Sequence, residues 1–189
     1  LDGIQAAAKV GLAPVKLNAV VRRGRNDGGI VELAAFARAH GHVLRFIEYM
    51  DVGDTNKWVL DDVVPSADVI ALINEVFPVE PMPVARRGDV AKRWRYVDGS
   101  GEIGVISSVT QPFCTDCTRA RVTSTGELFT CLFGSRKLDL RAMMRGGAAN
   151  DELREAVATA WSGRRDRYSE VMRGSASSEP RAEMSYLGG

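Results

Sequence analysis

Three cysteines lie close together in the second half of the chain, and they are all the cysteine it contains. Cys114 and Cys117 form a C-x₂-C pair, and Cys131 follows after thirteen further residues. Thiolates on a tight turn, joined by a third from a neighbouring hairpin, can converge on one metal centre. Three thiolates do not fill a four-coordinate site, so one position would stay open for another ligand. The pattern therefore predicts a metal centre held by these three cysteines.

Other interpretations of the cysteines stay open at this point. They could be a buried pair plus a core cysteine, or a structural zinc site with His40 or His42 as its fourth ligand. These histidines lie more than 70 residues upstream of Cys114. The missing fourth ligand favours an iron–sulfur cluster with a free iron over structural zinc. A thioredoxin-type redox pair is disfavoured, because the pattern shows no βαβ helix that starts at Cys114.

Two arginines, Arg119 and Arg121, follow the C-x₂-C pair directly. Side chains two positions apart in an extended chain point to the same side. With Cys131 on the partner strand, both guanidinium groups would flank the metal. A planar guanidinium suits bidentate contact with phosphate oxygens. Two solvated arginines on a hairpin would be the simpler interpretation without the cysteines, but beside them we expect anion binding.

Two further candidates lie on strand-like segments near the start of the chain. Lys16 lies within the apolar run 15–21, and Met50 ends the run 43–50. An unpaired lysine is rare inside a protein, so Lys16 either points into a ligand-binding lumen or lies on an exposed face or in a salt bridge, for example with Glu48. Met50 would lie at the mouth of a barrel, where active sites occur, although core packing is the commoner role of methionine.

The elements that must position these residues change character along the chain. The first fifty residues alternate between helix and strand, which implies parallel strands joined by helical crossovers, in an α/β barrel or a doubly wound sheet. Shorter strands, hairpins and helices follow. In the first fifty residues we expect a helix ending at Gly11, strands at 15–21 and 43–50, and a helix at about 28–40 capped by Asn26 or Asp27. A helix at 67–77 capped by Ser66 should follow, with no regular structure near Pro81 and Pro83. The remaining expected elements are hairpins of 92–97 with 103–109 and of 121–123 with 128–132, helices near 138–145 and 151–161, and an irregular tail at 174–189.

Composition excludes several functional classes. The net charge of +1 gives no general attraction to nucleic acid or membranes, and no apolar run approaches the roughly 20 residues of a membrane span. An odd number of cysteines without a signal peptide predicts a reduced, cytoplasmic setting. The chain opens at Leu1 within an alternating pattern, which indicates a piece of a longer protein.

Taken together, the motifs resemble the C-terminal part of the MoaA family, the GTP 3′,8-cyclases of molybdenum cofactor biosynthesis. The match runs along the whole chain, in order and with matching spacing. The segments that carry it are the three cysteines with their R-x-R motif, residues 15–18, residues 23–27, residues 45–50 and residues 183–189.

The resemblance implies a radical S-adenosylmethionine (SAM) enzyme, a lyase with two 4Fe–4S clusters. Its fold would be α/β, the C-terminal part of an incomplete barrel followed by an α+β iron–sulfur region. Residues 1–60 would be the last βα units of the barrel, residues 61–173 the region that binds the second cluster and GTP, and residues 174–189 a C-terminal tail. In the family, the first cluster cleaves SAM to a radical, and the second binds GTP through its open iron.

The resemblance also implies roles for individual residues. The ligands of the GTP-binding cluster would be Cys114, Cys117 and Cys131. GTP would be contacted by Arg119, Ala120 and Arg121, and its phosphates by Lys16. Met50 would contact SAM, and the tail that ends in Gly188 and Gly189 would reach the active site. GTP and SAM would be the partners, and a homodimer is left open.

The chain departs from the family at one large point, since it has no C-x₃-C-x₂-C motif for the radical-generating cluster. We therefore expect catalysis from the parent protein and none from this chain alone. Two alternative interpretations remain. The chain could be a non-catalytic binding module that a metal site holds together, or part of another radical SAM enzyme with an auxiliary cluster, such as a peptide-modifying one. Three cysteines with R-x-R between them favour a nucleotide over a peptide.

Overall fold

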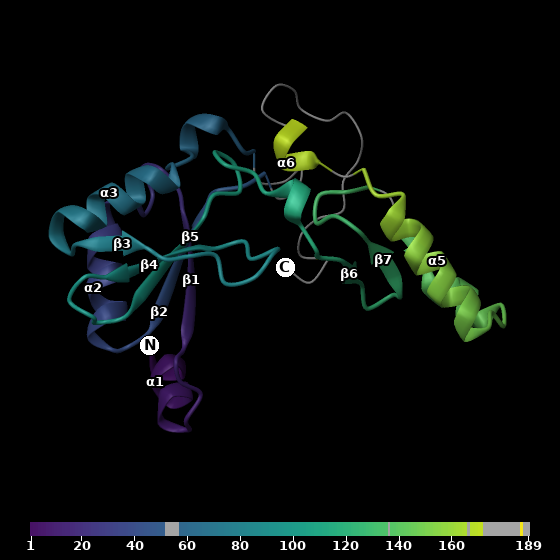
Figure 1. Ribbon diagram of the computed structural model, residues 1–189, viewed down its shortest axis with the longest axis horizontal. Helices are drawn as coiled ribbons and strands as arrows, with labels where there is room; N and C mark the ends of the chain where they lie inside the picture. Colours follow the sequence, from purple (N-terminus) through teal and green to yellow (C-terminus); the bar gives the residue numbers. More distant parts are fainter. Residues whose placement is uncertain (52–56, 136, 166, 172–185, 187–189) are drawn as a thin grey trace. The chain divides into compact units, whose positions relative to one another are not determined.

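The computed structural model describes residues 1–51, 57–135, 137–165, 167–171 and 186 (Figure 1). The chain divides into two compact units. The first comprises Leu1–Met50 and Trp58–Phe113, and the second comprises Asp51–Lys57 and Cys114–Gly189. No helix in the described part of the chain is long and apolar enough to cross a membrane.

A five-stranded mixed sheet forms the centre of the first unit, in the order β1-β2-β5-β4-β3. The neighbours β1, β2 and β5 run parallel, whereas β4 and β3 continue the sheet antiparallel. This confirms a mixed α/β fold. The strands are β1 Lys16–Val21, β2 Val43–Glu48, β3 Val79–Pro81, β4 Lys92–Tyr96 and β5 Glu102–Ile106.

Two helices, α2 Ile30–Ala39 and α3 Ser66–Val76, pack on one face of this sheet (Figure 1). A short 3₁₀ turn, η1 Asp27–Gly29, leads into α2, which connects β1 to β2. The predicted alternation of helix and strand over the first fifty residues is therefore confirmed. The other helical pieces of this unit are α1 Asp2–Lys9, which buries no side chain, and η2 Leu60–Asp62.

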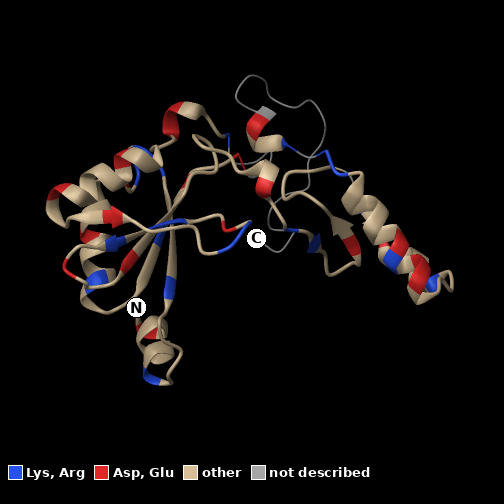
Figure 2. Cartoon of the chain, viewed as in Figure 1, with Lys and Arg blue, Asp and Glu red and all other residues tan. Residues whose placement is uncertain are grey.

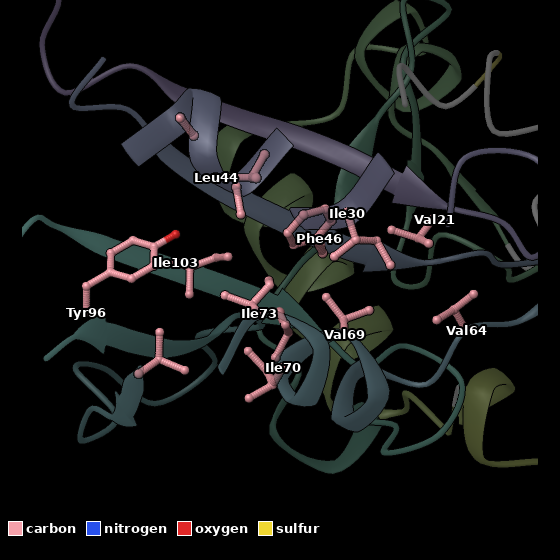
Figure 3. Packing of buried hydrophobic residues seen from close by; sticks show 14 residues of the cluster. Val21, Ile30, Leu44, Phe46, Val64, Val69, Ile70, Ile73, Tyr96 and Ile103 are labelled. Carbon is pink, nitrogen blue, oxygen red and sulfur yellow. The ribbon is translucent and has the colours of Figure 1, made fainter. Parts of the chain in front are cut away.

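Alternate residues of the strands build the core beneath α2 and α3 (Figure 3). Leu44 and Phe46 of β2 and Ile103 of β5 are almost fully buried, and Ile30 and Ile73 from the two helices pack in the same cluster. Because successive side chains of a strand point to opposite faces, the residues between them lie on the other face of the sheet. The period-2 pattern of β1 thus separates a core face from a face that α2 and α3 do not cover.

Neither predicted helix cap forms the expected side-chain hydrogen bond, although Asn26 does precede the 3₁₀ turn η1 as its N-cap residue. Ser66 is the first residue of α3, and its backbone N–H and hydroxyl both donate to the Glu48 carboxylate, so the acceptor comes from a distant strand. The Asn26 side chain turns back toward β1, where it accepts from the N–H of Arg22 and donates to the carbonyl of Val20, both at 2.8 Å. Gly29 occupies the cap position of α2 instead.

The strand predictions around the prolines also need correction. Pro81 ends β3, where it pairs with Trp94 at the edge of the sheet. An edge strand tolerates proline, because one side of it needs no backbone donor. Strand β5 ends at Ile106, short of the expected Val109, whose N–H donates to Glu48. Residues 61–113 belong to the first compact unit, in which β5 lies between β2 and β4.

The second unit contains a small antiparallel sheet in the order β6-β7-β8. The predicted hairpin is present, although its second strand ends at Phe129. Its turn requires Gly126, which has φ +82°, and a Cβ there would lie 2.8 Å from Cβ of Arg141. The elements are η3 Cys114–Asp116, β6 Arg121–Val122, β7 Glu127–Phe129, β8 Lys137–Asp139, α4 Leu140–Arg145, α5 Asn150–Ser162 and α6 Tyr168–Val171.

Helix α5 confirms the predicted helix near 151–161. The helix expected near 138–145 begins later, because residues 137–139 pair with β7 and Asp139 then caps α4 by accepting from the N–H of Ala142 at 2.8 Å. The predicted irregular tail at 174–189 lies outside the described residues except for Tyr186.

Candidate functional site

The cysteine pair is held in a tight turn. Cys114 opens η3, and the N–H of Cys117 donates to the carbonyl of Cys114 at 3.2 Å. Cys131 lies two residues beyond the end of β7, so it is not on the partner strand of the hairpin. It begins a second turn, in which the N–H of Phe133 donates to the Cys131 sulfur at 3.4 Å. None of the three cysteines forms a disulfide, and each is partly buried, so none of them is a fully buried core cysteine.

Arg119 lies against the thiol of Cys117, with Nε 3.4 Å from the sulfur. Burial alone would raise the pKa of Cys117, but hydrogen bonds and positive charge from Arg119, with a contribution from Arg164, outweigh it and lower that pKa. The thiolate is the form that binds metals, so this environment favours a ligand role.

The donor chemistry of the three cysteines fits an iron–sulfur cluster, since thiolates are the usual ligands of such clusters and one of the thiols, that of Cys117, lies beside a cation. In the described part of the chain, however, no three His, Cys, Asp or Glu side chains are grouped as metal ligands. Ligation by the three cysteines therefore stays a prediction.

The second arginine of the R-x-R motif is arranged differently from the first. Arg121 lies on β6 opposite Phe129 and is partly exposed. Its guanidinium forms no ion pair with any described side chain, which leaves it available to an anion. Ala120, between the two arginines, is exposed.

Lys16 lies on the sheet face opposite the helices and is exposed, like Asn18 on the same strand. Asn18 pairs in register with Arg45 of β2, so these three side chains share one face. Neither Lys16 nor Arg45 forms an ion pair among the described residues. Gly104 pairs with Arg45, and a Cβ there would lie 3.2 Å from Arg45 Cγ, so the glycine leaves room for this side chain.

Asn18 and Arg45 were not among the site residues predicted from the sequence. The signal was present in the strand period, which places position 18 on the same side as Lys16. Only the pairing of β1 with β2 identifies Arg45 as their neighbour. Basic and acidic residues alternate over both units, which agrees with the near-zero net charge (Figure 2).

Glu48 does not pair with Lys16, and this alternative is wrong. Its side chain lies on the core face, only 2% exposed, and accepts five hydrogen bonds of 2.5–2.9 Å. The donors are the N–H and hydroxyl of Ser66, the N–H of Val109, and the N–H and hydroxyl of Thr110. One buried carboxylate therefore joins the start of α3 to the segment that follows β5.

Met50 lies two residues beyond β2, at the carboxyl end of the parallel strands, and is partly buried. Lys16 begins β1 at their amino end. Since Lys16 pairs with Val43, seven residues before Met50, the two candidates are on the order of 20 Å apart along the strands. The structure therefore does not bring them together, and it places both in a different unit from the cysteines.

The histidines proposed as zinc ligands have other contacts. His40 Nδ1 lies 2.8 Å from the carbonyl of Phe36, and the His40 and His42 rings stack with centroids 6.1 Å apart. Both belong to the first unit, at the end of α2 and before β2.

A hollow of about 400 Å³ lies beside β1 in the first unit. Its lining is mainly apolar and includes Ala19 and Val21 of β1, Leu33 and Phe36 of α2, and Phe46 of β2. These β1 residues point to the core face, so the hollow opens on the side away from Lys16. It contains none of the candidate site residues.

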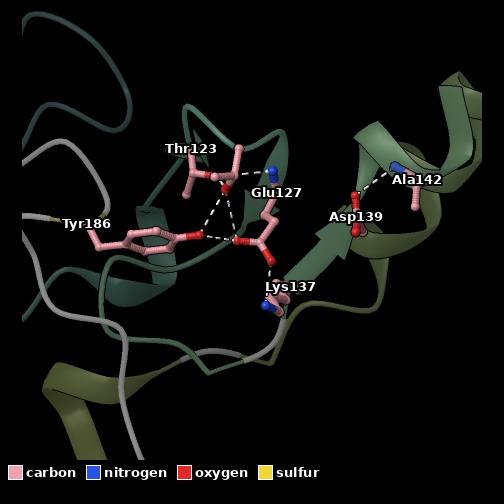
Figure 4. Close-up of polar contacts among 7 residues, drawn as sticks. Thr123, Glu127, Lys137, Asp139, Ala142 and Tyr186 are labelled. Atoms are coloured by element: carbon pink, nitrogen blue, oxygen red, sulfur yellow. Dashed lines mark hydrogen bonds and ion pairs between the residues drawn. The ribbon is translucent and has the colours of Figure 1, made fainter. Parts of the chain in front are cut away.

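A polar network docks Tyr186 onto the hairpin of the second unit (Figure 4). The Tyr186 hydroxyl donates to the Glu127 carboxylate and lies 2.9 Å from the Thr125 hydroxyl. Lys137 forms an ion pair with the same carboxylate. Lys137, followed by the Tyr186 and Thr125 hydroxyls, lowers the pKa of Glu127 below its usual 4.5. Gly188 and Gly189, predicted to reach the active site, lie outside the described residues.

The depressed pKa of Glu127 predicts an acid-sensitive contact. Its ionised form stabilises the folded state above pH 4.5, and this contribution is lost as the pH falls below that value. We expect Glu127→Gln to lower the urea midpoint at pH 7 and to lose this deficit in acid. Urea unfolding between pH 7 and pH 3 measures it, with the exposed Glu75→Gln as control. A deficit that is independent of pH would contradict the assignment.

Residues 42–170 match the family described as Molybdenum Cofactor Synthesis C, a span that includes all three cysteines and both arginines. A GTP 3′,8-cyclase of Acidothermus cellulolyticus is 55% identical over 175 residues, which are 90% of this chain and 48% of the relative.

Two further relatives carry the same name. GTP 3′,8-cyclase of Synechococcus sp. strain CC9605 is 49% identical over 192 residues, covering 100% of this chain and 54% of the relative. That of Xanthomonas axonopodis pv. citri is 46% identical over 173 residues, covering 90% and 51%. The chain thus spans about half the length of the curated relatives it matches.

Proposed function

Because the chain belongs to the Molybdenum Cofactor Synthesis C family, we propose that it supplies the cluster-binding and GTP-binding part of a GTP 3′,8-cyclase. The complete enzyme would be a radical SAM lyase that converts GTP to a cyclic 3′,8-dihydro-GTP in molybdopterin biosynthesis. The observation that carries the proposal is the family match over the three cysteines, joined to the contact of Arg119 with the Cys117 thiol.

Cys114, Cys117 and Cys131 would hold a 4Fe–4S cluster, and the absence of a disulfide between these partly buried thiols supports this. The cluster supplies an iron without a protein ligand, to which a nitrogen or oxygen of the substrate can bind. Arg119 lies beside the Cys117 sulfur and lowers the pKa of this thiol. SAM and the radical-generating cluster would be bound mainly by the part of the enzyme outside this chain.

Each unit offers its own candidate cations for the GTP phosphates. The first unit offers Lys16 and Arg45 on one sheet face, with the Asn18 amide between them. The second unit offers Arg121, and Arg119 beside the thiol. A guanidinium binds phosphate oxygens in pairs, whereas an ammonium acts as a point charge.

The first unit would form the end of an incomplete barrel. Three parallel strands, a helix layer on one face and polar side chains on the other face are the features of a barrel wall. β1 is an edge strand, so its next neighbour would come from the rest of the enzyme. Met50, at the carboxyl end of β2, would contact SAM, and Gly188 and Gly189 would reach the active site in the complete enzyme.

Arginine variants test the proposal. We expect Arg119→Ala and Arg121→Ala each to weaken GTP binding by roughly tenfold to a hundredfold, the loss of one charged hydrogen bond, with iron content unchanged. Equilibrium binding of GTP to the anaerobically reconstituted protein measures this, with the exposed Arg145→Ala as control. Unchanged affinity would refute a GTP role, and loss of iron in either variant would show that the arginines are structural.

A further inference from the structure

A short segment after α5 contacts the cysteine pair through three of its side chains. Arg164 Nη1 donates to the carbonyl of Cys117 at 2.7 Å. Arg167 donates to the Thr115 hydroxyl at 3.4 Å, and that hydroxyl donates to Glu170 at 3.3 Å. Arg167 and Glu170 also form an ion pair with each other. The C-x₂-C turn is thus fastened both at its middle and at its second cysteine.

The same segment reaches the turn that Cys131 begins. The ring of Tyr168 stacks on Phe133, with centroids 4.8 Å apart and an interplanar angle of 18°. The N–H of Phe133 donates to the Cys131 sulfur, so the stacked ring belongs to the residue that contacts this thiol. The Tyr168 hydroxyl donates to Asp51 at 2.7 Å, which anchors the ring at its far end.

We propose that Arg164, Arg167, Tyr168 and Glu170, here called the clamp, are positioning residues that fasten the two turns whose cysteines would supply the ligands of one metal cluster. This inference rests on the proposed function, because it takes the three cysteines to be ligands of one cluster. The clamp residues contact the neighbours of the ligands and the backbone of one of them, and they supply no ligand themselves.

The local structure explains why such a clamp is needed. The Cys114 turn is a three-residue 3₁₀ helix, and Cys131 lies outside the small sheet. Neither turn is held by a ladder of backbone hydrogen bonds, so ordering both for metal binding costs conformational entropy. Side chains that fix the turns beforehand reduce this cost. Contacts of this kind around metal ligands typically change metal affinity by roughly 10- to 100-fold when they are removed.

The clamp makes a prediction that needs no metal. In the metal-free protein, Arg164→Gln should speed amide exchange at Cys117. Tyr168→Ala should speed it at Phe133 and Gly134. The expected change is about tenfold, the factor for losing one hydrogen bond or ring contact worth about 1.4 kcal/mol. Hydrogen–deuterium exchange with peptide resolution measures it. Arg165→Gln is the matched control, since Arg165 is exposed and has no partner among the described residues.

The second readout is retention of iron. After anaerobic reconstitution, Arg164→Gln and Tyr168→Ala should release iron to a chelator roughly 10- to 100-fold faster than wild type and Arg165→Gln. Tyr168→Phe keeps the stacked ring and loses only the bond to Asp51, so its rate should lie between the two.

The outcomes separate the clamp from the proposed function. Wild-type exchange and wild-type iron release in Arg164→Gln and Tyr168→Ala would overturn the clamp while the cluster assignment stood. If neither the wild type nor the variants take up iron but the variants still exchange faster, the proposed function is overturned and the fastening of the turns is supported. Faster exchange with unchanged iron release would overturn the role of the clamp in metal binding.

Discussion

Cys117→Ser is expected to abolish stable binding of the iron–sulfur cluster. The arginine 3.4 Å from the Cys117 sulfur lowers the pKa of this thiol and so favours the thiolate, the form that binds metals, whereas serine offers only a hydroxyl. A chain with three cysteines has no spare thiol to replace it. Iron and acid-labile sulfide per chain after anaerobic reconstitution measure the effect, and we expect both to fall to background.

The control for this variant is Thr118→Ser, which changes the neighbouring exposed residue and leaves all three thiols in place. It should retain wild-type iron. Circular dichroism of both metal-free variants checks that the fold is kept. Wild-type iron and sulfide in Cys117→Ser would show that this cysteine is not a ligand, and the three-thiolate site would have to be abandoned.

Glu48→Gln is expected to destabilise the first unit by about 3 kcal/mol, because buried hydrogen bonds to a charged group are each worth about 1.5–3 kcal/mol. The carboxylate accepts from two N–H groups on the segment 109–110 and from the N–H and hydroxyl of Ser66. An amide has one acceptor oxygen, so its NH₂ group would face donors, and buried N–H groups would lose their partner. Urea unfolding at pH 7 measures the change.

Glu75→Gln is the matched control for this variant. Glu75 is an exposed carboxylate on α3, so its substitution should change stability by less than about 0.5 kcal/mol. A midpoint for Glu48→Gln equal to that of the control would contradict the role assigned to the buried carboxylate. Because Thr110 precedes Cys114 by only four residues, we also expect reduced iron content in this variant.

Local patterns in the sequence predicted the regular elements of the first fifty residues. The alternation around Lys16 and the helical period of residues 30–39 are properties of neighbouring residues, and the structure keeps them. The caps of α2 and α3 were not predictable in this way. Ser66 carries a good capping hydroxyl, but a carboxylate eighteen positions away takes its N–H and its hydroxyl.

The candidate site likewise contains features that neighbouring residues predict and features that depend on contacts between distant segments. The spacing of Cys114, Cys117 and Cys131 and the position of Arg119 can be read from one short segment. Arg45 as a neighbour of Asn18, and Tyr168 against Phe133, depend on pairings between distant segments that no local pattern carries. The short strand β8 was missed because three residues carry too little periodicity to separate a strand from the helix that follows.

The metal content of the anaerobically reconstituted protein, together with its response to GTP, tests the three-thiolate cluster site. We expect iron and sulfide in equal amounts, and a cluster spectrum that changes when GTP is added, because a purine nitrogen or oxygen would bind the iron that no cysteine occupies. One zinc per chain without sulfide would contradict this expectation. An iron–sulfur spectrum that ignores GTP and responds to a peptide would contradict it equally.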